Sequence, residues 1–237
     1  APAHCRLGLS VHRRRHHGAQ PRRLAAGGPV VARVFPARTS QRTLRLIMTT
    51  PAPSLSLQES ARPLLDFYQR GGVAPPELLP IDGAAMPEPY RSLLVHDGDM
   101  TPTLEKYHKD RIHLRLLTRE TTESAYNREV ILEAGEANNP VEFGAIAIHL
   151  EHFPEATHEL ILGESIPLGT ILEDHNILHQ SCPQAYFQVQ SDPLITEAFG
   201  LNESTGLYGR CNIHRDPEGN HLAEIVEILP PEHCAQG

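Results

Sequence analysis

The chain has 237 residues, of which 40% are hydrophobic, so it is long enough to enclose one substantial hydrophobic core. No run of 18 apolar residues occurs in it, which excludes a helical membrane span on the sequence pattern. Its formal net charge is −8.

The charge is divided unevenly at Met48. Ten arginines and no lysine, aspartate or glutamate precede this residue, whereas residues 48–237 carry 11 basic and 29 acidic side chains, a net charge of −18. An acidic body argues against nucleic acid as its partner, and no membrane partner is expected. We expect one domain over 48–237, as a monomer or a weak homodimer.

Residues 1–47 lack sustained hydrophobic periodicity and are rich in Gly, Pro and Arg. Such a segment cannot bury enough apolar surface to offset its ordering entropy, so it is predicted to be a disordered extension. It could be a nucleic-acid-binding arm that uses Arg13–Arg15 and Arg22-Arg23, an organellar transit peptide, or translated sequence upstream of a start at Met48. We favour the third, because MTTPAPSLSLQES is typical of a bacterial amino terminus.

The four cysteines are scattered along the chain and show no CxxC spacing. In a chain of this length they are expected to be reduced thiols, which is typical of a cytoplasmic protein. These cysteines are Cys5, Cys182, Cys211 and Cys234.

The first helix is predicted over Ser56–Arg70. Ser56 and Glu59 have the spacing of a capping box, and Gly71-Gly72 ends the helical pattern. Pro63 fits only the first turn of a helix, so the helix can begin later than Ser56.

Two further helical segments precede the first predicted strand. A proline-rich connection runs to Pro87 and is followed by a short helical stretch through Leu93-Leu94. Residues 96–108 then read as a turn leading into a helix, which Asp99 or Thr101 could cap.

The remainder of the chain is predicted to alternate between strands and a few helices. Alternating apolar residues predict strands over 112–120, 184–190, 206–214 and 222–229, and two more that flank the turn Gly135–Pro140 within 125–149. A connection from Glu159 enters a helix at Pro167, and a short helix covers 193–199. The predicted fold is α+β, with a single antiparallel sheet of about six strands and covering helices.

Arg128 is the most informative residue of this sheet. It lies in the strand before the turn, with Tyr126 and Val130 on its own side at a spacing of two. A strand arginine is often exposed to solvent. If Arg128 is buried it must meet an anion, because an unpaired buried charge costs several kcal/mol.

The histidines suggest a metal site only weakly. His175 and His179 are four residues apart, but the sequence between them lacks the glutamate of an HExxH motif, and His149 and His152 lie at a strand end and in a loop. We assign no metal. The chain also has no GxSxG, Walker or GxGxxG motif, and no organic cofactor is expected.

Five segments, taken in order, resemble the chorismate pyruvate-lyases, also called 4-hydroxybenzoate synthases. The resemblance spans roughly Leu93 to Pro230. Its segments are Asp99-Met100-Thr101 with Leu104-Glu105, Arg128–Leu132 followed by an Ala-Gly-Glu turn, Ile166–Gly169, Gly206–Arg210, and a final hairpin that ends in Leu229-Pro230.

The resemblance implies a fold and a reaction. The family folds as an antiparallel sheet whose helices cover an internal ligand pocket, and it eliminates pyruvate from chorismate to leave 4-hydroxybenzoate, without a metal or an organic cofactor. By this resemblance Arg128 would hold the ring carboxylate, a pairing that suits the planar guanidinium. The backbone N–H groups of Met100 and Leu168 would complete the carboxylate site, and the Met100 side chain would help to close the pocket.

The resemblance also implies a pocket glutamate that faces the ether end of the substrate. Matching without gaps places the family's glutamate at Val226, so the sequence departs from the pattern there. A two-residue shift through Gly219-Asn220 would bring Glu224 into the pocket, and we expect Glu224 in this role, with Glu227 as the alternative.

Two other functions remain open at the level of the sequence. The same fold resembles the effector-binding domain of a family of bacterial transcription regulators, in which the pocket binds a small molecule without turnover. A lyase that acts on a related enolpyruvyl acid is the other possibility, because the shape of the pocket decides the substrate.

Overall fold

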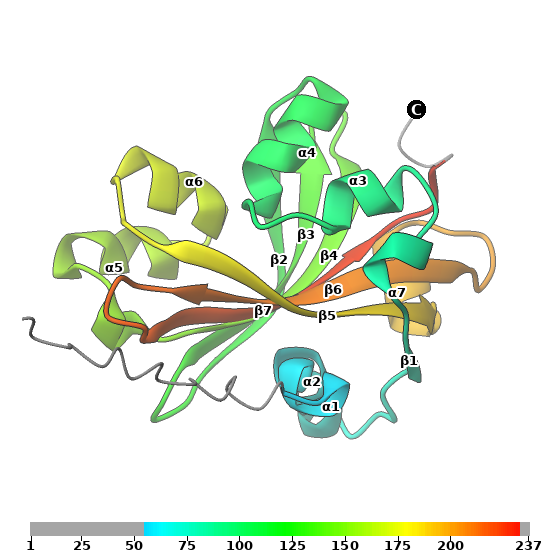
Figure 1. The fold of residues 1–237 in the computed structure, drawn as a ribbon, viewed down its shortest axis with the longest axis horizontal. Coiled ribbons are helices and arrows are strands. Elements are labelled where there is room, and N and C mark those ends of the chain that lie inside the picture. The colour runs from blue at the N-terminus through cyan, green and yellow to red at the C-terminus, as the bar shows by residue number, and fades with distance from the viewer. Residues whose placement is uncertain (1–54, 233–237) are drawn as a thin grey trace, which may run out of the picture. The chain divides into compact units, whose positions relative to one another are not determined.

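The computed structural model describes residues 55–232 (Figure 1). The predictions for residues 1–47, Met48, Cys5 and Cys234 lie outside this range. Within it, no helix combines the length and the apolar composition that a membrane crossing requires.

The described residues form one antiparallel sheet of seven strands, in the order β1-β5-β6-β7-β4-β3-β2. The predicted α+β class is confirmed. The strands are β1 (Leu78–Pro80), β2 (Ile112–Thr121), β3 (Tyr126–Ala134), β4 (Asn139–Ile148), β5 (Gln180–Gln190), β6 (Gly206–Arg215) and β7 (His221–Leu229).

The helices are short and lie in the connections. They are α1 (Leu57–Ser60), α2 (Arg62–Arg70), α3 (Tyr90–Leu94), α4 (Met100–His108), α5 (Glu155–Leu162), α6 (Leu168–Asp174) and α7 (Pro193–Ala198), together with the 3-10 turns η1 (Gly83–Ala85) and η2 (Leu150–His152).

The seventh strand, β1, lies in the proline-rich connection before Pro87, for which the sequence predicts no strand. It pairs only with β5, so it is an edge strand. An edge tolerates Pro80, which has no N–H to donate to a neighbouring strand. Strand β5 begins at Gln180, four residues before the predicted start at Gln184, and it tolerates Pro183 because this proline lies at an irregularity in the pairing with β6.

The first predicted helix is present as two pieces. The capping box is confirmed: the Glu59 N–H donates to Ser56 Oγ at 3.2 Å, and the Ser56 N–H donates to Glu59 Oε2 at 2.8 Å. Pro63 cannot donate a backbone hydrogen bond, so α1 ends and α2 begins around Ala61, with the proline in the first turn of α2.

The sequence pattern predicts a connection from Glu159 onward, whereas the structure has helix α5 over Glu155–Leu162. In the structure α5 begins after Pro154 and buries Thr157 and Ile161 against the rest of the domain. These two residues are four apart and therefore share one face of the helix. An eight-residue helix offers only this single pair, too short a pattern for periodicity to reveal.

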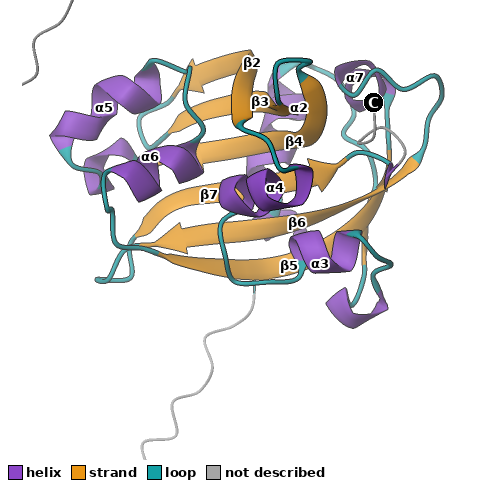
Figure 2. Ribbon diagram, turned by 90° about the horizontal axis from the view of Figure 1, so that it is seen from above, coloured by secondary structure: helices purple, strands orange, loops and turns teal. Residues whose placement is uncertain are grey.

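Helices cover both faces of the sheet (Figures 1 and 2). On one face α2 and α7 pack over a single apolar cluster that includes Leu64, Phe143 and Phe187. On the other face there are two apolar clusters, one beneath α3 and α4 and the other beneath α5 and α6. A seam of buried polar residues separates these two clusters, and the candidate site lies there.

Candidate functional site

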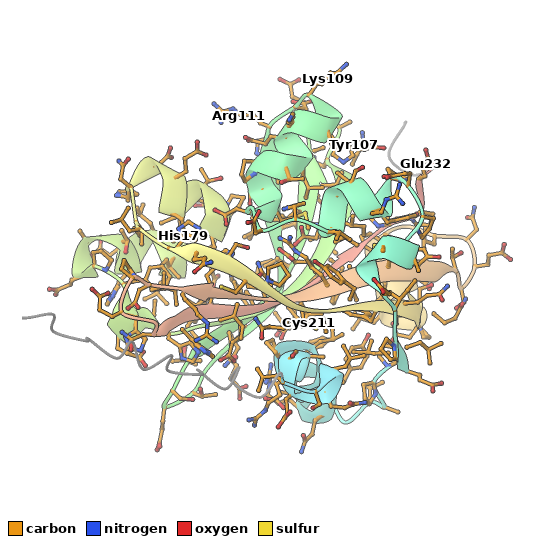
Figure 3. The ribbon with its side chains drawn as sticks, viewed as in Figure 1. Tyr107, Lys109, Arg111, His179, Cys211 and Glu232 are labelled. Carbon is orange, nitrogen blue, oxygen red and sulfur yellow. The ribbon has the colours of Figure 1, made fainter. Side chains whose placement is uncertain are left out.

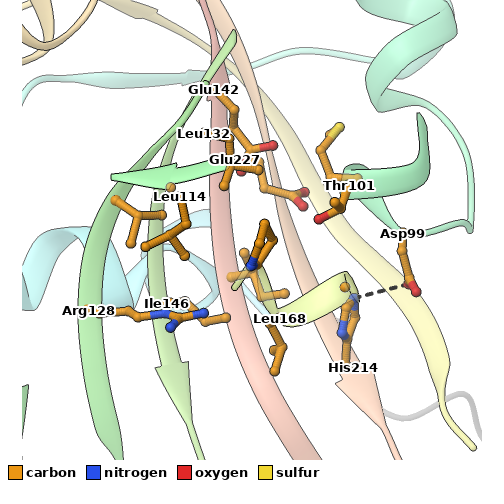
Figure 4. Close-up of a pocket in the computed structure, with 16 residues that line it drawn as sticks. Asp99, Thr101, Leu114, Arg128, Leu132, Glu142, Ile146, Leu168, His214 and Glu227 are labelled. Carbon is orange, nitrogen blue, oxygen red and sulfur yellow. Dashed lines mark ion pairs between the residues drawn. The ribbon is translucent and has the colours of Figure 1, made fainter. Parts of the chain in front are cut away.

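A cavity of about 50 Å³ lies between the first turns of α4 and α6 and strands β3, β4, β6 and β7 (Figure 4). The expected internal pocket is therefore present. Its apolar lining includes Met100, Leu132, Ile146, Leu168 and Ile225. Its polar lining includes Asp99, Arg128, Glu142, His214 and Glu227.

Three of the four residues expected at the site line this pocket. Arg128 comes from β3, Met100 from the first turn of α4 and Leu168 from the first turn of α6. The two helix starts approach closely, because a Cβ atom on Gly169 would lie 2.8 Å from the Thr101 hydroxyl. Glycine at this position therefore lets α6 close over the pocket beside α4.

Arg128 is buried, with only 1% of its surface exposed, so the exposed alternative does not apply. Its Nη1 donates to the Ile161 carbonyl at 3.3 Å, whereas its Nε has no hydrogen-bond partner. No carboxylate among residues 55–232 lies within ion-pair distance of it. Burial lowers the pKa of the Arg128 guanidinium, but an arginine remains charged in a protein. Arg128 is thus a buried cation with an unused donor at the pocket.

Glu164 is the carboxylate that acts on Arg128 from a distance, and it is already engaged elsewhere. It accepts a hydrogen bond from the Tyr126 hydroxyl and one from Arg119 Nη1, the latter at 2.5 Å. The negative charge of Glu164 is therefore already paired with Arg119, which is more exposed than Arg128.

The other buried arginine on this face, Arg210, is fully paired. It donates to the Glu227 carboxylate and to the backbone carbonyls of Leu94, His96 and Gly98, the last three at 3.3, 3.1 and 3.2 Å. These contacts fasten the connection between α3 and α4 to the sheet. Arg210 thereby positions the start of α4, and with it Met100.

Glu142 and Glu227 form a buried carboxyl pair beside the cavity. Glu227 is bound by Arg210, whereas Oε2 of Glu142 has no hydrogen-bond partner. Burial and the nearby Glu227 carboxylate raise the pKa of Glu142 well above its ordinary value. The ion pair with Arg210 holds Glu227 in place, whereas burial favours the protonated form of Glu142.

Glu224, the glutamate expected in the pocket, lies on the opposite face of the sheet. The pairing of β7 contains no two-residue shift near it: Glu224 pairs with Ala147 of β4, and Glu227 pairs with Gly144. Successive strand residues point to opposite faces, so Glu227 reaches the pocket and Glu224 cannot. The expected placement is corrected to Glu227, the alternative that the sequence left open.

On its own face Glu224 takes part in a histidine cluster, with His221 Nδ1 at 2.7 Å and His149 Nε2 at 3.7 Å from its Oε1. His149 and His221 lower the pKa of Glu224 to about 2. The nearby Glu224 carboxylate raises the pKa of His149. The position of Glu224 thus indicates a contribution to stability.

We expect Glu224→Gln to lower the free energy of unfolding by about 0.5–1 kcal/mol near pH 5.5. Because the pKa of Glu224 is depressed, its contribution is present above its ordinary value of 4.5 and is lost as the pH falls toward 2. His149 also contributes stability, but its pH dependence is reversed: the contribution is present at low pH and is lost as the pH rises through the raised pKa of His149. Urea unfolding at about pH 3, 5.5 and 8.5 measures this, with the exposed turn variant Glu218→Gln as control. An equal difference at all three pH values would contradict it.

A second polar cluster forms one side of the pocket and was missed in the sequence. Asp99 makes no side-chain cap on α4. It instead meets His179 Nε2 at 2.9 Å through Oδ2 and His214 Nε2 at 3.5 Å through Oδ1. Figure 3 shows His179 at the start of β5, and Figure 4 shows Asp99 and His214 together. These residues come from three separate segments, so no local spacing could have grouped them.

Glu142 is a second pocket residue that the sequence did not identify, although its position in the strand pattern is unusual. It is the only charged residue in the apolar stretch VEFGAIAI, which forms a central strand. A charge within such a run is expected to have a partner or a function, because burying it alone is costly.

Comparisons with known proteins leave the family of the chain open. No family model matches it, and no curated protein matches its sequence. Among solved structures, the ligand-binding domain of a protein assigned to the GntR family of transcriptional regulators, from Bordetella bronchiseptica, is 13% identical with a TM-score of 0.41, covering 51% of this chain and 86% of that one. PhnF from Mycobacterium smegmatis is 11% identical with a TM-score of 0.46, covering 74% of this chain and 81% of that one. Both TM-scores are below 0.5, so neither likeness assigns a function to this chain.

Proposed function

We propose that this protein binds a small organic carboxylate, with Arg128 as the anchor for the carboxylate group. The observation that carries this proposal is the burial of Arg128 without an ion pair among the described residues. A carboxylate would accept hydrogen bonds from the unused guanidinium donors and would neutralise the buried charge. Charge-assisted bonds of this kind are strongest where water is excluded.

The rest of the pocket supports a ligand with an apolar body. Ile146, Leu168 and Ile225 supply apolar surface beside Arg128. In the present conformation the cavity of about 50 Å³ has room for a few water molecules. A ring-sized ligand therefore requires the covering turns of α4 and α6 to move outward, and binding and release would be coupled to that motion.

Elimination of pyruvate from chorismate is the candidate reaction, and the carboxyl pair is the observation that favours it over binding alone. In this reaction the ether C–O bond breaks, the ring loses a proton and becomes aromatic, and enolpyruvate leaves and takes up a proton. A protonated Glu142 could donate to the departing oxygen, and the Glu227 carboxylate, which is paired with Arg210, could accept the ring proton. A carboxyl group whose pKa is raised by burial, beside a second carboxylate held in an ion pair, is a typical arrangement for acid–base chemistry.

Two measurements on the full chain test the proposal. The first is calorimetric titration with 4-hydroxybenzoate and with 4-hydroxybenzamide, which have the same ring but differ in the carboxylate. We expect the acid to bind at least about tenfold more tightly, since a buried charged hydrogen bond contributes roughly 1.5–3 kcal/mol. Equal affinity for the amide and the acid, or binding of neither, would overturn the carboxylate proposal.

The second measurement is incubation with chorismate while pyruvate and 4-hydroxybenzoate are followed together. Equal appearance of both products supports the lyase reaction. Binding of the acid without product formation would support the alternative of a binding module, or of a lyase for a related enolpyruvyl acid. That outcome would contradict the proposed chorismate reaction but would still support the carboxylate site at Arg128.

A further inference from the structure

We propose that Asp99, His179 and His214 bind a divalent metal ion of the zinc class at the edge of the pocket. One ligand atom from each residue can be chosen so that all three lie within 4.8 Å of one another. Measured from the same carboxylate oxygen, Asp99 Oδ1, His179 Nε2 lies at 3.0 Å and His214 Nε2 at 3.5 Å. Ligand atoms around a tetrahedral zinc ion with bonds of about 2.0–2.1 Å lie roughly 3.3–3.4 Å apart. Both separations from Asp99 are therefore close to those around a bound ion.

His214 is the residue that most needs a partner. It is 3% exposed, and neither of its ring nitrogens has a hydrogen-bond partner. The nearby hydroxyl of Ser181 cannot supply one readily, because it accepts from Asn212 Nδ2 at 2.8 Å and donates to the Gly98 carbonyl. Buried polar atoms without partners are rare in native proteins and point to an unseen ion or water. A metal ion bound at Nε2 would account for the position of this ring.

His179 is arranged as metal-binding histidines commonly are. Its Nδ1 lies 2.9 Å from the Ile177 carbonyl, which can only accept, so Nδ1 carries a proton. The other nitrogen, Nε2, is directed at the Asp99 carboxylate. A backbone carbonyl that fixes the tautomer of a ligating histidine in this way is a usual outer contact of zinc sites.

The cluster supplies three protein ligands, the number found in zinc sites that keep one position open. Asp99 and His214 both line the cavity that Arg128 also lines, and Figure 4 shows them on a different side of it from Arg128. The open position would then accept water or an oxygen of the pocket ligand. The ligand class this implies is a carboxylate that carries a second oxygen donor.

The test uses the metal alone, so its result does not depend on the carboxylate proposal. The full chain is stripped with a chelator and titrated with Zn²⁺ by calorimetry and with Co²⁺ by visible absorption. Because the chain has 15 histidines, stoichiometry alone does not identify the site. The variants Asp99→Asn and His179→Gln each remove one ligand with little change of shape, and His175→Gln is the matched control, an exposed histidine four residues from His179.

We expect Asp99→Asn and His179→Gln to weaken Zn²⁺ binding by about 100-fold or more, and His175→Gln to leave it unchanged. The Co²⁺ complex of the wild type should show the intense visible bands of a four-coordinate ion, and these bands should be lost in the two ligand variants. Anomalous diffraction from zinc-soaked wild-type crystals gives a result that is independent of any variant. Unchanged affinity in both ligand variants, or the absence of a zinc peak among the three side chains, would overturn the proposal.

Discussion

Replacing Arg128 with methionine is expected to make the protein more stable and, in the same variant, to remove its affinity for carboxylates. Arg128 is 1% exposed and has one hydrogen bond, to the Ile161 carbonyl. Holding a charge there without a close counter-ion costs free energy, and methionine fills much of the same space without the charge. We expect the free energy of unfolding to rise by about 1–3 kcal/mol.

The binding part of this prediction has the opposite sign. Removal of one partner of a buried charge pair costs about 2–5 kcal/mol, so the affinity for 4-hydroxybenzoate should fall by at least about 30-fold. Urea unfolding and calorimetric titration measure the two effects on the same preparation. Arg111→Met is the control, because the Arg111 side chain is 81% exposed, and it should change neither quantity.

A clear loss of stability in Arg128→Met would contradict the assignment. It would mean that Glu164, although bound by Tyr126 and Arg119, neutralises Arg128 well enough to make it a structural cation. A gain of stability with a loss of binding is the signature of a residue retained for its ligand. A gain of stability with unchanged binding would mean that the ligand's carboxylate contacts another residue of the pocket and not Arg128.

Arg210→Met is expected to have the largest effect on stability of any single change on this face of the sheet. The substitution leaves Glu227 buried beside Glu142 without its ion-pair partner. It also removes the hydrogen bonds that fasten residues 94–98 to β6. Breaking a buried ion pair by removing one partner typically costs about 3–5 kcal/mol, and we expect a loss of that size.

Urea unfolding at neutral pH measures this loss, and a double variant separates its causes. In Arg210→Met/Glu227→Gln the stranded charge is gone, so part of the stability should return, while the part due to the lost carbonyl contacts should not. Arg215→Met, at the half-exposed end of the same strand, should stay within about 0.5 kcal/mol of the wild type. A loss below 1 kcal/mol in Arg210→Met would show that the pair is not tightly coupled to the fold.

The opposite outcomes expected for two buried arginines follow from their partners. Arg210 is surrounded by a carboxylate and three carbonyl groups, whereas Arg128 has a single carbonyl. Both residues lie within strand patterns that look alike in the sequence. Only the neighbours that folding brings to them distinguish a structural cation from one available to a ligand.

The sequence by itself determined the elements whose signals are local. The hairpin around Gly135–Pro140, the final hairpin before Leu229 and the capping box at Ser56 were all predictable, because turn residues, strand periodicity and caps act within a few positions of the chain. The α+β class follows from these elements. The short edge strand β1 and the helix α5 escaped, because three and eight residues are too few to establish a pattern.

The tertiary structure decided which side chains meet. A shift of one residue along a strand reverses the face of the sheet to which a side chain points. The sequence does not fix the length of the preceding turn accurately enough to decide which face each glutamate of β7 occupies. In the structure Glu227, and not Glu224, lies at the pocket. Asp99 and His179 are 80 positions apart and come together only because β5 and β6 pair next to the start of α4. The sequence supplied an arginine and several acids, and the packing of the sheet against two short helices determined which of them form a site.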